Sequence, residues 1–163
     1  MTKPKYNESN KLNVRQFILQ DNEIVWKLHF AGLDQMGANA GKGPWDDDLN
    51  HIEEVYLQNG GEFLIGEYKG QIVAMGALKK TSDTKAEVKR MRVDPKFQGR
   101  GFGQRMLEEL EKRARELGYT VLHLDTSTKQ GPAQKLYLKN GYKEVGRATF
   151  HGLETILYEK QLV

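Results

Sequence analysis

Cysteine is absent from this sequence of 163 residues. Its absence excludes a disulfide framework, a zinc site built on thiolates and a cysteine nucleophile. No segment approaches the roughly 18 apolar residues that a membrane-spanning helix needs. The polar start MTKPKYNESNKLN has no apolar stretch of signal-peptide length. We therefore expect a cytoplasmic protein that does not associate with a membrane.

Candidate metal ligands are also scarce. The sequence has four histidines, and none of them has the spacing of a metal site: His29, His51, His123 and His151. We expect each to be structural and no metal to be bound.

Composition and charge describe a folded protein with an uneven surface. Hydrophobic residues make up 38% and charged residues 29%, which excludes a disordered chain and favours one domain over 1–163. The net charge is only +3, yet Lys85–Arg105 holds seven basic and two acidic residues, and 46–54 is acidic. A basic centre suits an anionic ligand and an acidic patch a cationic one, although charge alone equally allows two solvated faces.

The order of apolar runs and chain breakers predicts an α/β (α+β) fold, with a mixed sheet and helices on its faces. Strands are expected at 14–20, Glu62–Tyr68, Gln71–Leu78, Ala86–Val93, Val121–Leu124, Lys143–Phe150 and Glu154–Leu162. Helices are expected after Asp21, after Asp46–Asp48, between Gly103 and Gly118, and over Gln130–Asn140. The aspartates are expected as helix caps, the segment 41–44 as a break, and Lys69-Gly70 as a hairpin turn.

A glycine-rich loop, Gln98-Gly99-Arg100-Gly101-Phe102-Gly103, separates the predicted strand ending at Val93 from the next helix. Glycine permits a close approach of the backbone, and a helix start offers unpaired N–H groups that bind phosphate. Arg100 and Arg105 are expected to add positive charge there. The spacing G-x-G-x-G matches neither the mononucleotide P-loop nor the dinucleotide fingerprint. Glycine spacing alone leaves a ligand-free connector open.

The loop resembles the Q/R-x-x-G-x-G/A motif of the GNAT superfamily of N-acetyltransferases, with Gln98, Gly101 and Gly103 at its fixed positions. The upstream string VKRMRVDP (Val88–Pro95) is similar to that family's fourth strand. The downstream string AQKLYLKNGY (Ala133–Tyr142) is similar to its later A-x-x-L-Y-x-K-x-G-F/Y segment. The resemblance covers nearly the whole chain. It implies a single-domain, mostly antiparallel mixed sheet flanked by helices, and acetyl-CoA as the acyl donor.

The resemblance also implies which residues bind acetyl-CoA. Main-chain N–H groups are expected to bind the pyrophosphate at Gln98, Gly99, Arg100, Gly101, Gly103 and, where the helix begins, Gln104. The pantetheine arm is expected to pair like an added strand with the main chain of Met91, Arg92 and Val93. Gln130 stands where the family often has Asn, and it keeps the same donor and acceptor groups on a longer stem.

Two catalytic roles follow from the resemblance. Tyr137 matches the tyrosine that in many members protonates the departing CoA thiolate, and the pKa values of phenol and thiol lie close enough for that transfer. Glu87 matches a general base of the histone-acetylating branch, and strand alternation predicts that it shares a face with Val93. The alternatives are a half-buried aromatic side chain for Tyr137, and for Glu87 a solvated residue paired with Lys or Arg while water chains act as the base.

The resemblance further implies that the stretch of chain between the first strand and the hairpin forms a wall of the acceptor pocket. Trp45 and Asp46 could bind a cationic amine by cation–π contact and by charge. The alternative is a tryptophan that packs its loop onto the domain beside helix-capping aspartates.

Together these features predict an acetyl-CoA-dependent N-acetyltransferase that moves acetyl to a primary amine by direct attack. A non-catalytic acyl-CoA-binding sensor or regulatory module is the alternative. We expect a small-molecule or peptide amine as the acceptor and no nucleic acid, since no reader motif is present. The sequence leaves a homodimer open.

Overall fold

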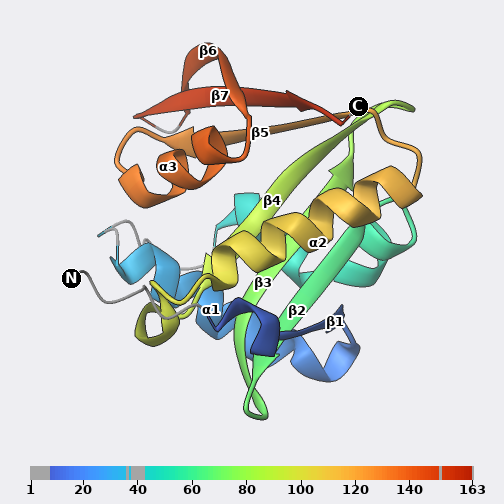
Figure 1. The fold of residues 1–163 in the computed structure, drawn as a ribbon, viewed down its shortest axis with the longest axis vertical. Helices are drawn as coiled ribbons and strands as arrows, with labels where there is room; N and C mark the ends of the chain where they lie inside the picture. Colours follow the sequence, from blue (N-terminus) through green and yellow to red (C-terminus); the bar gives the residue numbers. More distant parts are fainter. Residues whose placement is uncertain (1–7, 36, 38–42, 151, 163) are drawn as a thin grey trace, which may run out of the picture.

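Seven strands form one sheet in the order β1-β2-β3-β4-β5-β7-β6 in the computed structural model, which describes residues 8–35, 37, 43–150 and 152–162 (Figure 1). The strands are β1 (Asn13–Gln16), β2 (Glu62–Tyr68), β3 (Gln71–Lys80), β4 (Lys85–Val93), β5 (Val121–Ser127), β6 (Lys143–Phe150) and β7 (Leu153–Gln161). Every neighbouring pair is antiparallel except β4 and β5, which are parallel. The predicted fold class, a mixed and mostly antiparallel sheet, is confirmed.

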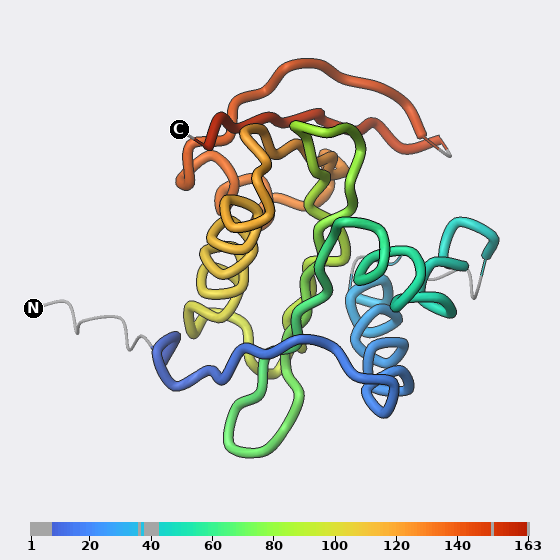
Figure 2. Tube along the Cα trace, turned by 90° about the vertical axis from the view of Figure 1, so that its right-hand side faces the viewer, coloured from blue at the N-terminus to red at the C-terminus, as the bar shows by residue number. Residues whose placement is uncertain are grey.

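Helices cover both faces of the sheet. They are α1 (Asn22–Gln35), α2 (Phe102–Glu116) and α3 (Gly131–Lys139). In Figure 2, α2 and α1 stand on opposite sides of the central strands. The α2 side holds a core cluster that includes Met106, Leu107 and Leu110. The α1 side holds a second cluster that includes Val25 and Leu28. These residues lie on two of the helices that the sequence predicted.

Local turn chemistry explains where the central strands end. Lys69 and Gly70 both have positive φ, 51° and 79°, as a two-residue hairpin turn requires. Asp94 accepts a hydrogen bond from the Lys96 N–H at 3.0 Å, and Pro95 opens a short 3₁₀ turn, η5 (Pro95–Phe97). The strand β4 therefore stops at the predicted Asp94-Pro95 step.

The segment between α1 and β2 differs from the expected helix. It forms a 3₁₀ helix, η3 (Pro44–Asn50), followed by a π-helical turn, η4 (Glu53–Leu57), and neither has a side-chain cap. Asp46 and Asp48 instead bind Arg90 of β4, so the expectation that they cap a helix is wrong. Tertiary contacts have overridden local preference here.

Asp21 likewise does not cap α1 with its side chain. It follows the short 3₁₀ turn η2 (Leu19–Asp21), and its carboxylate accepts two hydrogen bonds from Arg15 at 2.8 Å. A further 3₁₀ turn, η1 (Ser9–Lys11), precedes β1. The break expected at 41–44 lies partly, and His151 wholly, outside the described residues.

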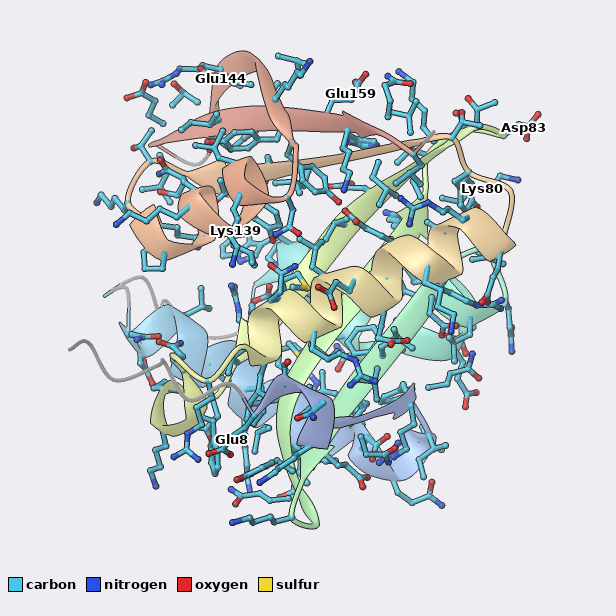
Figure 3. The ribbon with its side chains drawn as sticks, viewed as in Figure 1. Glu8, Lys80, Asp83, Lys139, Glu144 and Glu159 are labelled. Atoms are coloured by element: carbon cyan, nitrogen blue, oxygen red, sulfur yellow. The ribbon has the colours of Figure 1, made fainter. Side chains whose placement is uncertain are left out.

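Charged side chains lie mainly on the outer surface of the molecule. Figure 3 labels Lys80 and Asp83 beside the β3–β4 turn, where Nζ and Oδ1 are 3.5 Å apart, and Glu144 and Glu159 on the β6–β7 hairpin. Within the described ranges, no helix is long and apolar enough to cross a membrane.

Candidate functional site

A cleft opens where the two parallel strands separate. β4 and β5 are paired only from Lys85–Val121 to Glu87–His123. Beyond that point a cavity of about 1050 Å³ is lined by β4 residues 87–93, β5 residues 125–127, the glycine loop and α3. After Glu87, the edge of β4 that faces β5 therefore carries main-chain groups with no strand partner in the described part of the chain. Such an edge can accept an extended ligand as an added strand.

A β-bulge in β4 decides which side chains face each side of the sheet. Ala77 is opposite Lys89 and Met75 is opposite Arg92, so β4 has one extra residue at Arg90-Met91. Arg90 has a φ of 58°, in the left-handed region. The bulge fits beside Gly76, where a Cβ would lie 2.7 Å from the Met91 sulfur.

The bulge corrects one prediction. Val88 and Val93 both pack on the α2-side cluster. On β3, Leu78 belongs to that cluster, so its neighbour Lys79 faces the other side of the sheet. Lys79 is paired with Glu87. Glu87 therefore faces the α1 side of the sheet, and the expectation that Glu87 and Val93 share a face is wrong. The two residues would share a face only if side chains alternated without interruption from Glu87 to Val93, and the bulge breaks that alternation.

The glycine loop runs along the cavity into α2. Gly99 and Gly101 have φ values of 78° and 85°, which other residues rarely adopt. Gly101 is the N-cap and provides no capping side chain. The first-turn N–H groups of α2 thus remain available to an anion beside the cavity, which Phe102 and Gly103 line. At Gly103 a Cβ would make only ordinary contacts, 3.7 Å from Leu136.

The two arginines near the loop both have partners within the chain. Arg105 donates to the carbonyls of Ser9 and Leu12 and so ties α2 to the start of the chain. The guanidinium of Arg100 lies 5.0 Å from the Phe97 ring centroid and 3.7 Å from the Glu8 carboxylate. The expectation that Arg105 adds charge at the phosphate position is wrong, because carbonyls near the start of the chain bind its guanidinium. The same expectation for Arg100, which belongs to the loop itself, stays a prediction.

Three glutamines beside the cavity differ in what their side chains do. Gln98 donates to the Val93 carbonyl at 3.1 Å and so connects the loop to β4. Gln104 exchanges hydrogen bonds with Asn140 and joins α2 to the end of α3. Gln130 lines the cavity and accepts a hydrogen bond from Thr126 at 2.6 Å.

Tyr137 projects from α3 into the buried wall of the cleft. Its side chain is 6% exposed, and its ring lies 5.5 Å from that of Tyr142. Burial raises the pKa of the Tyr137 phenol to about 12, while Arg92 opposes the rise and Asp125 adds to it. The phenol therefore stays protonated at neutral pH, which is the form that can donate a proton.

Glu87 lines the same cavity as Tyr137 from the β4 side. Among the residues that the structure describes, no Lys, Arg or His nitrogen lies within ion-pairing distance of its carboxylate. Glu87 therefore forms no salt bridge with the described residues, in contrast to the alternative in which it is paired with Lys or Arg.

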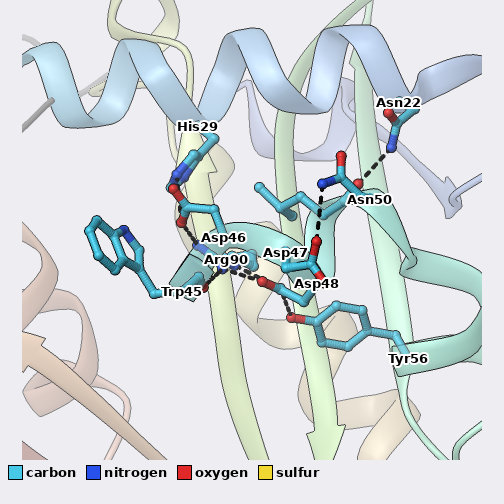
Figure 4. Close-up of polar contacts among 10 residues, drawn as sticks. Asn22, His29, Trp45, Asp46, Asp47, Asp48, Asn50, Tyr56 and Arg90 are labelled. Carbon is cyan, nitrogen blue, oxygen red and sulfur yellow. Dashed lines mark hydrogen bonds and ion pairs between the residues drawn. The ribbon is translucent and has the colours of Figure 1, made fainter. Parts of the chain in front are cut away.

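Asp46 belongs to a buried polar cluster beside the cavity (Figure 4). Its Oδ1 lies 3.3 Å from Arg90 Nη1 and 3.1 Å from His29 Nε2. Burial lowers the pKa of His29 despite the nearby Asp46. Burial would raise the pKa of Asp48, but Arg90 and Tyr56 hold it below its ordinary value.

Trp45 is not a core residue. Its side chain is 54% exposed and lines the cavity, and in Figure 4 the ring points away from the Asp46–Arg90 contacts. Its carbonyl accepts a hydrogen bond from Arg90 at 3.1 Å. The structure thus brings Trp45 and Asp46 together at the cleft, with the ring at its open side.

Several cavity residues were not foreseen. The side chains of Arg90 and Arg92 reach the site through the bulge, which leaves no sequence signal. Phe150 and Leu153 come from the β6–β7 hairpin. Two of these residues had a positional signal, because Asp125 directly follows the strand predicted at Val121–Leu124 and Phe150 ends the strand predicted at Lys143–Phe150. No cluster of three or more metal-binding side chains occurs in the described ranges.

Comparison with known proteins gives a consistent result. The sequence model of the acetyltransferase (GNAT) family matches residues 26–142. An uncharacterised N-acetyltransferase of Escherichia coli K12, YjgM, is 26% identical over 140 residues, covering 83% of this chain and 84% of that protein. IAA acetyltransferase of Azospirillum brasilense is 38% identical over 85 residues. That match covers 52% of this chain and only 56% of the Azospirillum protein.

Solved structures share the fold. A GNAT-family acetyltransferase of Staphylococcus aureus superposes with a TM-score of 0.85 at 21% identity, covering 93% of this chain and 99% of that one. YncA of Salmonella typhimurium, a putative acetyltransferase solved with acetyl-CoA, has a TM-score of 0.78 at 18% identity, covering 94% and 95%.

Proposed function

Because the chain belongs to the GNAT family of acetyltransferases, we propose that it transfers the acetyl group of acetyl-CoA to a primary amine by direct attack. One observation carries the proposal. A single cavity is lined by the glycine loop at the start of α2, by the unpaired edge of β4, by Tyr137 and by Glu87. The groups that we propose to bind acetyl-CoA and those that we propose to transfer protons thus line the same cavity, where β4 and β5 separate.

The described residues fit acetyl-CoA. Uncapped N–H groups at the α2 N-terminus suit its pyrophosphate, and the free β4 edge suits its pantetheine arm. The Salmonella relative was solved with this molecule bound. The proposed main-chain contacts are Met91, Arg92, Val93, Gln98, Gly99, Arg100, Gly101, Gly103 and Gln104, with Gln130 contributing its side chain. When bound, acetyl-CoA supplies an activated thioester carbonyl.

Tyr137 and Glu87 would handle the two protons of the reaction. The amine nitrogen forms a bond to the acetyl carbon, and the bond from that carbon to sulfur breaks. Glu87 takes one proton from the ammonium form, directly or through water, because an ammonium cannot attack, and later releases it to solvent. Tyr137 gives its phenolic proton to the departing sulfur, and the second proton of the attacking nitrogen restores the phenol through water. The chain has no cysteine to carry an acetyl group, which favours a single transfer step.

The acceptor would enter from the side of Trp45 and Asp46. Asp46 is already bound to Arg90 and His29, so we propose that it shapes this wall and adds negative potential. The exposed ring of Trp45 can cover an amine or its apolar substituent. We take residues 1–163 as one catalytic domain and a small-molecule or peptide amine as its acceptor.

A thiol-release assay tests the proposal. The protein is incubated with acetyl-CoA and a panel of amines while free CoA thiol is followed and N-acetyl product is identified by mass spectrometry. Amine-dependent thiol release supports acetyl transfer. Tight acetyl-CoA binding by calorimetry, with no release above the blank for any amine class, would instead identify a non-catalytic acyl-CoA-binding module.

A further inference from the structure

Arg92 lacks the partners that its neighbour Arg90 has. Arg90 donates to Asp48 through Nε at 3.0 Å and lies 3.3 Å from Asp46. For Arg92, the hydrogen bond that the structure gives is from Nη1 to the Met91 carbonyl at 3.4 Å. Its Nε is buried and has no hydrogen-bond partner among the described residues. In the described part of the chain, no carboxylate lies within ion-pairing distance of the Arg92 guanidinium.

This guanidinium lies in the cavity, on its acceptor side. Arg92 lines the cavity together with Gly32 of α1 and Asp46. Its register partner is Met75, whose side chain belongs to the α1-side cluster. The side chain of Arg92 therefore points away from α2, where we place the acetyl-CoA loop.

The α1 helix leaves room for this arrangement at Gly32. A Cβ there would lie 2.7 Å from Arg92 Cδ and 2.8 Å from Nε. The absence of a side chain at Gly32 is what allows the arginine to extend along α1 into the cavity. Such close packing fixes the direction of the guanidinium.

The surrounding charges leave Arg92 available to an anion. Asp48 is bound by Arg90 and Tyr56, and Asp46 Oδ1 lies 3.3 Å from Arg90 and 3.1 Å from His29, whereas Asp46 Oδ2 is buried with no hydrogen-bond partner among the described residues. Burial lowers the pKa of Arg92, the charge of Arg90 adds to the shift, and Tyr137 and Asp46 oppose it. A half-buried arginine whose Nε is buried and has no carboxylate partner is costly unless a ligand supplies one.

We propose that the acceptor amine carries a carboxylate, as an amino acid does, and that the Arg92 guanidinium binds this carboxylate. The planar fork of arginine matches the two oxygens of a carboxylate. The acceptor's amine then lies between Arg92 and the thioester position, on the side of Glu87. This inference rests on the proposed acetyl transfer and specifies its substrate class.

The mouth of the cavity guides the choice of probes. Trp45 and Phe150 line it and are 54% and 48% exposed. Two exposed aromatic rings favour acceptors with an apolar side chain. We therefore choose phenylalanine, leucine and methionine, each compared with its α-amide and with the decarboxylated amine. The amide keeps the shape and removes only the negative charge.

The experiment measures kcat/KM for these amines by thiol release with the wild-type protein. We expect each amino acid to exceed its amide and its decarboxylated amine on the order of 10- to 100-fold, as for a lost hydrogen-bonded ion pair. The α-amine of an amide is the weaker base and is more often deprotonated, so amine reactivity works against the expected result. Amides and decarboxylated amines that match or exceed the amino acids would overturn the inference while acetyl transfer stands. No thiol release with any of the nine compounds or with other amines would overturn the proposed function itself.

A variant pair assigns the effect to Arg92. In Arg92→Gln, which changes the side chain and keeps the main chain that we propose to contact acetyl-CoA, the preference for the amino acid over its amide should disappear. Arg147→Gln, which changes an arginine paired with Glu144 and Glu154 on the β6–β7 hairpin, should keep it. A preference that persists in a folded Arg92→Gln protein would overturn the assignment. The substrate series on the wild type tests the inference even if Arg92→Gln does not fold.

Discussion

Val88 and Val93 of β4 pack on the same face of the sheet although an odd number of positions separates them. The bulge at Arg90 causes this, and it sends the side chains of Arg90 and Arg92 to the α1 side. A single irregularity thus gives the cleft two different walls. The α2 side keeps apolar strand residues and the glycine loop, while the α1 side receives two arginines.

Replacing Tyr137 by Phe should lower kcat about 100-fold while leaving acetyl-CoA affinity unchanged, because the variant removes only the proton donor. Since the pKa of Tyr137 is raised to about 12, its ionisation should not limit the wild-type rate near neutral pH. Steady-state kinetics and calorimetry measure the two quantities. Tyr119→Phe is the control, as its hydroxyl binds the distant Gly60 carbonyl. An unchanged kcat in Tyr137→Phe would remove the phenol from the mechanism.

Glu87→Gln should depress the rate most at low pH, where free amine is scarcest and a base matters most. The ratio of wild-type to variant kcat/KM should fall as pH rises toward the pKa of the amine. Glu144→Gln, a change at an exposed ion pair, should give a ratio near one throughout. A Glu87→Gln ratio that is constant across pH would assign proton removal to another group.

Gly101→Ala and Gly103→Ala should behave differently. At Gly101, φ is 85°, so alanine should cost about 1–2 kcal/mol and weaken acetyl-CoA binding by displacing the helix start. At Gly103, the added Cβ makes ordinary contacts within a helix, where alanine is favoured by up to about 1 kcal/mol. Thermal unfolding and calorimetry compare the two variants. Equal losses in both would contradict the local geometry described for the loop.

Gly32→Ala should disturb Arg92 without unfolding the protein. Alanine suits a helix, but its Cβ would lie 2.7 Å from Arg92 Cδ, so the flexible arginine must move. We expect about a tenfold higher KM for a carboxylate-bearing amine, with the KM for acetyl-CoA unchanged. An unaltered KM for the amine would show that the position of Arg92 is not critical.

Asp48→Asn should lower the free energy of unfolding by about 3 kcal/mol at pH 7, because it breaks a buried pair with Arg90. The pKa of Asp48 is lowered in the folded protein, so its contribution exists above the unfolded value and is lost as pH falls. The difference between variant and wild type should therefore shrink from about pH 5 downward. Urea unfolding across pH measures it, and a difference that grows on acidification would contradict this sign.

Features set by nearby residues could be predicted from the sequence. The Lys69-Gly70 turn and the helix α2 after the glycine loop depend on neighbours in the chain, and the structure has both where the pattern predicted them. The resemblance to GNAT motifs also predicted the main parts of the cleft, which are the strand β4, the glycine loop and Tyr137. Both kinds of inference rely on short segments.

Features set by distant residues could not be predicted. The bulge at Arg90 needs Gly76 on the neighbouring strand, and alternation along β4 gives no sign of it. From the sequence, Asp48 is predicted to cap a helix, but in the structure its carboxylate binds Arg90, 42 residues away. Arg105 is predicted to add charge at the phosphate position, but in the structure it donates to the carbonyls of Ser9 and Leu12. In each case the tertiary partner replaced the local role.

A two-substrate initial-rate experiment distinguishes direct attack from transfer through an acetylated enzyme. Thiol release is measured while acetyl-CoA and the best amine of the panel are both varied. Direct attack within one cleft predicts amine-dependent release and double-reciprocal lines that intersect, because both substrates must be bound together. Thiol release that does not depend on the amine, or parallel lines that indicate an acetylated enzyme, would contradict the account.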